Sequence, residues 1–104
     1  EEVNFDPQIS ICLFRICQES LTNIARYAQA SLVEVSLKLP DNKIKLSIKD
    51  NGIGFDTEHI GQKKTWGLLG MKERAAMMQG KVIINSEKQK GTTIEVIIPF
   101  SSTA

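Results

Sequence analysis

The chain has 104 residues, 41% of them hydrophobic and 24% charged, a composition typical of one globular domain. Thirteen Lys and Arg against twelve Asp and Glu give a formal net charge of +1, which argues against a protein that mainly coats nucleic acid or an anionic membrane. No apolar run approaches the roughly 20 residues that span a bilayer, and no secretory signal opens the chain. Because the chain begins without Met, we expect it to be a piece of a longer protein.

The first predicted element is a helix over residues 8–29. Asp6 followed by Pro7 is a favoured helix start, with Asp as the cap and Pro in the first turn. Cys12 and Cys17 lie about 140° apart around this helix, too poorly aligned for a disulfide, and with a single His they make no structural zinc site. The helical period predicts an apolar stripe that faces the core, formed by Leu13, Cys17, Leu21, Ile24 and Ala28.

Two strands follow, over residues 33–39 and 44–48, where apolar and polar residues alternate. Turn-forming residues at 40–42 predict that the two strands form an antiparallel hairpin. Residues 51–66 lose this periodicity and predict a long polar loop, which in a compact domain is usually functional or mobile.

A second helix is predicted over residues 68–79, with Leu68, Met71, Ala75 and Met78 on its core face, and it ends at Gly80. Residues 81–86 and 92–99 then predict a second hairpin. Helices on one face of a mostly antiparallel sheet indicate an α+β fold, a two-layer sandwich.

A polar stripe on the first helix could bind a metal ion. Glu19 and Asn23 stand four residues apart and project the same way, and Arg26 and Tyr27 continue their row by one turn. Carboxylate and amide oxygens suit Mg²⁺, and a guanidinium suits phosphate oxygens. A solvated polar face would give the same pattern.

Three glycine-containing segments could surround a nucleotide. Asp50, at the end of a strand, could accept a hydrogen bond from an exocyclic amine such as that of adenine, with Gly52 and Gly54 close to the flat ligand. Residues 67–71 open the predicted second helix, whose free N–H groups would form a phosphate site. Thr92 could bond a ring nitrogen. A capped glycine-rich connection and a flexible helix entry are the plainer alternatives.

The order of these segments resembles the N-box and three glycine boxes of the histidine-kinase ATP-binding domain, which has the Bergerat fold. The resemblance covers most of the chain, from about residue 14 to residue 100. The sequence segments 14–23 and 67–74 are most similar to those of sensor kinases that act on response regulators of the LuxR/NarL type.

The resemblance implies a role for each residue of the polar stripe. Asn23 would coordinate Mg²⁺, and Glu19 would orient a metal-bound water and act in catalysis. Arg26 would contact phosphate. Tyr27 stands where many members have His, and its phenol can still donate to a phosphate or ribose oxygen.

For the nucleotide itself, the resemblance implies that Asp50 holds the adenine amine, that Gly52 and Gly54 shape the pocket, and that Thr92 completes adenine recognition. Residues 55–66 would be the ATP lid. The remaining ATP-binding positions implied lie at the base of this lid: Gly67, Leu68, Gly70 and Met71.

The implied function is that of the catalytic domain of a two-component sensor histidine kinase, occupying residues 1–104 and truncated at its N-terminal edge. It would bind Mg-ATP and pass the γ-phosphate to a histidine on a separate dimerisation domain. The phosphoryl group would then pass from that histidine to a response regulator. We expect a cytoplasmic module with no direct nucleic-acid contact, whose parent kinase is in many cases membrane-anchored. Two alternatives stay open: a non-catalytic nucleotide-gated interaction module and a serine kinase of the anti-sigma-factor type.

Overall fold

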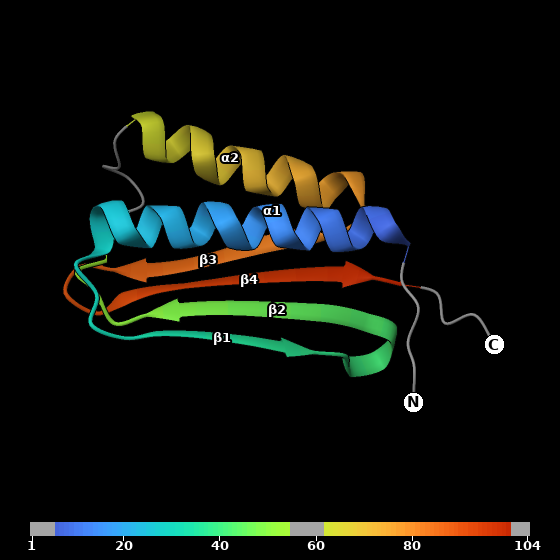
Figure 1. The fold of residues 1–104 in the computed structure, drawn as a ribbon, viewed down its shortest axis with the longest axis horizontal. Coiled ribbons are helices and arrows are strands. Elements are labelled where there is room, and N and C mark those ends of the chain that lie inside the picture. The colour runs from blue at the N-terminus through green and yellow to red at the C-terminus, as the bar shows by residue number, and fades with distance from the viewer. Residues whose placement is uncertain (1–5, 55–61, 101–104) are drawn as a thin grey trace.

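The structure is a computed structural model that describes residues 6–54 and 62–100, with the backbone alone for residues 62–66. Two helices lie on one face of a four-stranded antiparallel sheet (Figure 1). The predicted two-layer α+β sandwich is therefore confirmed. Neither described helix combines the length and the hydropathy that crossing a membrane requires.

The first helix is α1, Pro7–Asn23, and a π-helical turn, η1, Ile24–Ala28, continues it. The Asp6 side chain accepts a hydrogen bond of 2.9 Å from the Gln8 N–H, so the predicted cap is confirmed. The helical run ends at Gln29, which takes a left-handed conformation with a φ of 51°.

The core-facing stripe of α1 differs from the predicted one. The buried side chains of α1 are Ile9, Cys12, Ile16 and Ser20. Leu13, Cys17 and Ile24 are only partly buried, and Leu21 is 41% exposed. The sequence pattern therefore placed the centre of the buried face at the wrong angle around the helix axis. It could not show that α2 packs beside Cys12, whose Sγ donates to the Arg74 carbonyl oxygen at 3.4 Å.

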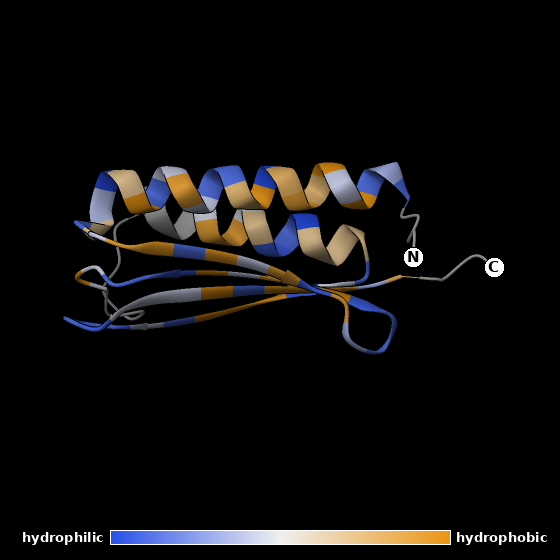
Figure 2. Ribbon diagram, turned by 60° about the horizontal axis from the view of Figure 1, so that its bottom comes forward, coloured by the Kyte–Doolittle hydropathy of each residue, from blue (hydrophilic) through white to orange (hydrophobic). Residues whose placement is uncertain are grey.

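The sheet has the order β1-β2-β4-β3, and every neighbouring pair is antiparallel. Both predicted hairpins are confirmed, one joined through a short 3₁₀ turn, η2, Pro40–Asn42. The strands are β1, Val33–Lys38; β2, Lys43–Asp50; β3, Lys81–Glu87; and β4, Gly91–Pro99. Figure 2 shows hydrophobic and hydrophilic residues alternating along them. The buried positions of β2 and β4 form the floor of the core: Ile44, Leu46, Ile48, Ile94, Val96 and Ile98.

The second helix, α2, spans Gln62–Met77 and begins six residues before the predicted start at residue 68. Leu68, Met71 and Ala75 are buried and Met78 is partly buried, as predicted for its core face. Residues 62–66 of the predicted loop and lid are therefore helical, and the lid's residues 55–61 lie outside the described part of the chain.

The edge strand β1 is exposed along its whole length. Its apolar positions pair with the helix-facing residues of β2, with Val35 opposite Ile48 and Leu37 opposite Leu46. Val35 and Leu37 are nevertheless 50% and 56% exposed, because α1 packs against β2 and β4 and α2 against β3 and β4.

Candidate functional site

Asp50 ends β2 inside the molecule, with only 4% of its surface exposed. One carboxylate oxygen, Oδ1, accepts a hydrogen bond of 2.8 Å from the Gly52 N–H. The second oxygen makes no hydrogen bond within the described part of the chain. Asp50 is thus a buried acceptor with a fixed orientation, which a ligand that donates a hydrogen bond could satisfy.

The loop after Asp50 passes between two other backbone segments and needs glycine at both predicted positions. A Cβ at Gly52 would lie 2.2 Å from the Ala28 carbonyl oxygen, at the end of η1. Gly54 has a φ of +65°, and its Cβ would lie 2.1 Å from the Glu87 carbonyl oxygen. Hydrogen bonds from the Ile53 N–H to Ala28 and from the Gln89 N–H to the Ile53 carbonyl hold the loop between these two segments.

Asn51 braces the same loop on its outer side. Its Oδ1 accepts hydrogen bonds from the N–H groups of Ser31 and Leu32, at 2.9 Å and 3.0 Å, and its Nδ2 donates to the Ser31 Oγ at 2.9 Å. Sequence reasoning missed this role. The only signal was an Asn directly after a strand, a residue type that commonly bonds nearby backbone groups.

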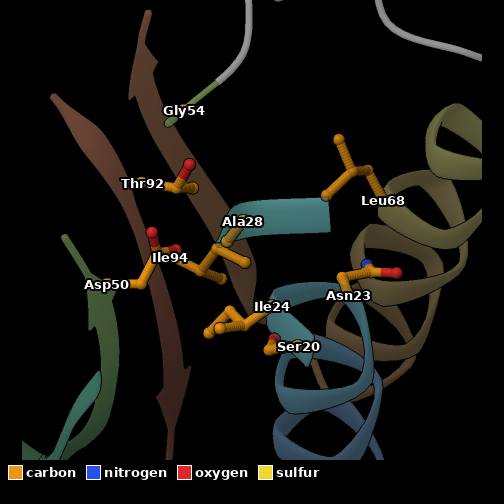
Figure 3. Close-up of a pocket in the computed structure, with 9 residues that line it drawn as sticks. All are labelled: Ser20, Asn23, Ile24, Ala28, Asp50, Gly54, Leu68, Thr92 and Ile94. Atoms are coloured by element: carbon orange, nitrogen blue, oxygen red, sulfur yellow. The ribbon is translucent and has the colours of Figure 1, made fainter. Parts of the chain in front are cut away.

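A pocket of about 360 Å³, part of it open to solvent, lies between this loop and the two helices. Figure 3 shows Asp50 and Thr92 on one side of the pocket and Asn23 and Leu68 on the other. Between them lie the apolar side chains of Ile24, Ala28 and Ile94 and the hydroxyl of Ser20. The lining residues are Ser20, Asn23, Ile24, Ala28, Asp50, Gly54, Leu68, Thr92 and Ile94. Five predicted binding residues, each from a different element or loop, therefore meet at one cavity.

The Thr92 hydroxyl is held by a second hydroxyl. Its Oγ1 lies 2.7 Å from the Ser86 Oγ on the neighbouring strand β3. Ser86 was not among the predicted site residues. Its place opposite Thr92 follows only from the register of the last hairpin.

On the helix side, Asn23 presents an unsatisfied polar group. Its Nδ2 is buried and has no hydrogen-bond partner within the described residues. A Cβ at Gly67 of α2 would lie 2.7 Å from the Glu19 Oε1 and 3.6 Å from the Asn23 Nδ2. The absence of a side chain at Gly67 therefore lets α2 approach the predicted stripe of Glu19 and Asn23.

These donors fit a magnesium site that a substrate completes. The described residues contain no group of three or more His, Cys, Asp or Glu that could hold a metal alone. Mg²⁺ in nucleotide enzymes usually takes only one or two side-chain oxygens, together with substrate phosphates and water. Glu19 and Asn23, one turn apart on α1, supply two oxygen-bearing side chains: Asn23 lines this pocket, and Glu19 lines a second hollow between α1 and α2.

A second hollow follows the seam between α1 and α2, with a volume of about 760 Å³ that includes open solvent. We call it the helix groove. Its lining residues are Arg15, Gln18, Glu19, Thr22, Gly67, Gly70, Met71 and Arg74. Met71 is buried, and its Sδ accepts a hydrogen bond of 3.3 Å from the Ser20 Oγ. Glu19, Gly67, Gly70 and Met71 thus meet here rather than in the Asp50 pocket.

Two sequence predictions about this region are wrong. Gly67 and Gly70 lie inside α2 and do not open it, so their N–H groups are not the free first-turn donors that were expected. Arg26 and Tyr27 are exposed residues of η1 and do not continue the row of Glu19 and Asn23 into either hollow. A π-helical turn has a wider repeat than an α-helix, so it rotates the residues after Asn23 away from that row.

Comparison with known proteins identifies the family. Residues 9–102 match the family described as histidine kinase-, DNA gyrase B-, and HSP90-like ATPases. Over 98 residues the chain is 41% identical to the signal transduction histidine-protein kinase/phosphatase DegS of Brevibacillus brevis, covering 94% of this chain and 25% of that protein. Over 97 residues it is 38% identical to the oxygen sensor histidine kinase NreB of Staphylococcus carnosus, covering 93% and 28%. The chain thus spans about a quarter of these relatives.

Solved structures share the fold at low sequence identity. The ATP-binding domain of PrrB from Mycobacterium tuberculosis superposes with a TM-score of 0.72 at 19% identity, covering 88% of this chain and 69% of that one. A blue-light activated histidine kinase from Erythrobacter litoralis superposes with a TM-score of 0.80 at 15% identity, covering 97% and 33%. The resemblance to histidine-kinase ATP-binding domains is confirmed, and the chain belongs to the histidine kinase-, DNA gyrase B-, and HSP90-like ATPases.

Proposed function

We propose that this chain binds Mg-ATP and supplies the γ-phosphate for autophosphorylation of a histidine on a separate dimerisation domain of a sensor kinase. One observation carries the proposal. A single cavity joins the buried, half-satisfied Asp50 carboxylate to the unsatisfied Asn23 amide. A nucleotide has a hydrogen-bond donor on its base and oxyanions at its other end, and it therefore complements both sides of this cavity.

At the base end, Asp50 accepts a hydrogen bond from the adenine exocyclic amine. The Gly52 N–H fixes the carboxylate in place, and the bond between Ser86 and Thr92 restricts the Thr92 hydroxyl. Ile24, Ala28 and Ile94 supply apolar contacts for the ring. Such a site selects a flat base with an amine at its edge, since the buried acceptor would stay unpaired opposite a carbonyl.

At the phosphate end, Asn23 and Glu19 hold the metal, and Gly67, Leu68, Gly70 and Met71 border the phosphates. Mg²⁺, when bound, neutralises phosphate charge and orients the oxygens for transfer. Arg26 and Tyr27 remain proposed phosphate contacts. They lie outside both hollows, so contact would require their side chains to turn toward the ligand.

The partners proposed for this module follow from its relatives, which are named histidine kinases. A histidine-bearing dimerisation domain would receive the phosphoryl group, and a LuxR/NarL-type response regulator would receive it next. The 104-residue chain alone is expected to bind ATP and to transfer nothing to itself.

Isothermal titration of Mg-ATP into the chain tests the proposal, with Asp50→Asn as the variant and Glu34→Gln, an exposed β1 carboxylate, as the matched control. We expect Asp50→Asn to weaken binding by about tenfold or more, the effect of losing one charge-assisted hydrogen bond, and Glu34→Gln to leave it unchanged. Absence of binding by the unmodified chain would refute the proposal. Equal binding by Asp50→Asn would refute the adenine contact.

The metal assignment needs a different pair of ligands. Asn23→Ala should weaken binding of Mg-ATP much more than binding of adenosine, because adenosine has no phosphates for a metal to bridge. Equal losses for the two ligands would contradict the metal role of Asn23.

A further inference from the structure

We infer that Arg15 and Arg74 form a second phosphate-binding element, which contacts the terminal phosphate of the bound nucleotide from the far end of the helix groove. This inference rests on the proposed function and extends it. Neither arginine was among the predicted site residues. The positively charged residue predicted for phosphate, Arg26, lines neither hollow, whereas Arg15 and Arg74 both line the helix groove.

The first argument is the continuity of one row along α1. Asn23, Glu19 and Arg15 are separated by four residues each, so their side chains follow one another on the same side of the helix in steps of about 6 Å. Asn23 lines the Asp50 pocket, and Glu19 and Arg15 line the groove. A chain of phosphates that starts at Asn23 and runs away from the base is therefore directed along this row toward Arg15.

The second argument is the shape of the opposite wall. Gly67 and Gly70 lie in the interior of α2, where glycine is a poor choice for helix stability. A Cβ at Gly70 would have no atom within 4 Å, so packing does not explain this glycine. Gly67 leaves room for the Glu19 carboxylate, and Gly70 leaves its side of the groove open.

The third argument is electrostatic. The groove carries two guanidinium groups, Arg15 and Arg74, against one carboxylate, Glu19, which gives a formal charge of +1. Neither arginine forms an ion pair within the described part of the chain. A guanidinium with unused donors matches phosphate oxygens in charge and in geometry, and two on opposite helices can hold one phosphate between them.

The experiment compares ATP with ADP, which differ only in the terminal phosphate. We expect Arg15→Ala and Arg74→Ala each to weaken binding of Mg-ATP by about tenfold and to leave binding of Mg-ADP unchanged. Arg15→Lys should recover part of the loss, since it keeps the charge without the planar pair of donors. Lys72→Ala removes a positive charge from an exposed position on α2 outside the groove and controls for long-range attraction.

The outcomes separate this inference from the proposed function. Equal weakening of ATP and ADP by Arg15→Ala, or no effect on either, would overturn the inference while Mg-ATP binding by the unmodified chain still stands. An effect of Lys72→Ala as large as that of Arg15→Ala would also overturn it, because net charge alone would then account for the loss. Arg15 and Arg74 are exposed, so we expect the variants to fold, and circular dichroism melting confirms this before titration.

Discussion

Two glycines of this chain, Gly52 and Gly70, provide a direct test of the structure. Replacing each by Ala is expected to change the free energy of unfolding in opposite directions. At Gly52 an added Cβ would lie 2.2 Å from the Ala28 carbonyl oxygen and 2.9 Å from the Ala28 Cβ. At Gly70 it would meet nothing within 4 Å. Replacing each by Ala adds the same methyl group to two environments, and only one of them has room for it.

The expected magnitudes follow from these distances. Gly52→Ala forces the loop or the end of η1 to move by about 1 Å, an overpacking that costs roughly 1–3 kcal/mol. The movement also strains the 2.8 Å hydrogen bond from the Ile53 N–H to Ala28, worth about 1 kcal/mol. The free energy of unfolding should fall by about 2–4 kcal/mol. Gly70→Ala should raise it by about 0.5–1 kcal/mol, because Ala is the better residue inside a helix.

Thermal and urea unfolding followed by circular dichroism measure both effects on the free energy of unfolding. For a domain of this size we expect the Tm to fall by at least about 8 °C for Gly52→Ala and to rise by a few degrees for Gly70→Ala. An unchanged Tm for Gly52→Ala would refute the close approach between the loop and η1. A lower Tm for Gly70→Ala would show that Gly70 does not lie in open space within α2.

Two further predictions concern other contacts. Burial raises the pKa of the Cys12 thiol above its ordinary value of 9.0, although the nearby Arg74 partly opposes the shift. The folded protein then holds this proton more tightly than the unfolded chain, so its contribution to stability is complete below pH 9.0 and falls as the pH rises above it. Cys12→Ala should lessen that fall, measured by urea titration on both sides of pH 9.0. Asn51→Ala removes three hydrogen bonds and should lower the free energy of unfolding by about 1–2 kcal/mol, whereas Ser31→Ala, which removes one of them, should have a smaller effect in the same urea titration.

Local patterns were sufficient to predict the element types and both hairpins. Alternation of apolar residues marks β2, and turn residues mark the connection between the first two strands. Which face of α1 is buried was not predictable to the same accuracy. Ile16 is fully buried and Leu21 is 41% exposed, because the buried face of a helix depends on where its neighbours lie. A helical period gives the width of the apolar stripe, but α2 and the sheet decide which part of it is buried.

Exposure of β1 illustrates a related limit. Val35 and Leu37 alternate with polar residues just as Ile48 and Leu46 do on the neighbouring strand, so the pattern alone predicts burial for all four. Burial requires a covering element, and the two described helices pack mainly against β2, β3 and β4.

The candidate site was predictable where it depends on single residues with demanding environments. Asp50 accepts a hydrogen bond from the Gly52 N–H, and neither Gly52 nor Gly54 has room for a side chain. Few residue types satisfy such constraints, so a short sequence motif is enough to identify these positions. Arg26 and Tyr27 were placed by extending an α-helical row through residues that form a π-helical turn. Such a turn has no clear sequence signal, and one changed hydrogen-bond repeat is enough to redirect every side chain after it.

A substitution at Gly70 is expected to affect the stability of the fold and the affinity for nucleotide in opposite ways. If the helix groove receives the terminal phosphate, a methyl group at Gly70 narrows the space opposite Arg15 even though it stabilises α2. Gly70→Ala should therefore raise the Tm and weaken binding of Mg-ATP, two effects of opposite sign from one atom. Titration and melting of the same sample measure both. A variant that is more stable and binds Mg-ATP as tightly as the unmodified chain would show that the groove takes no part in binding. Loss of affinity for ATP with retained affinity for ADP would instead place the terminal phosphate between the two helices.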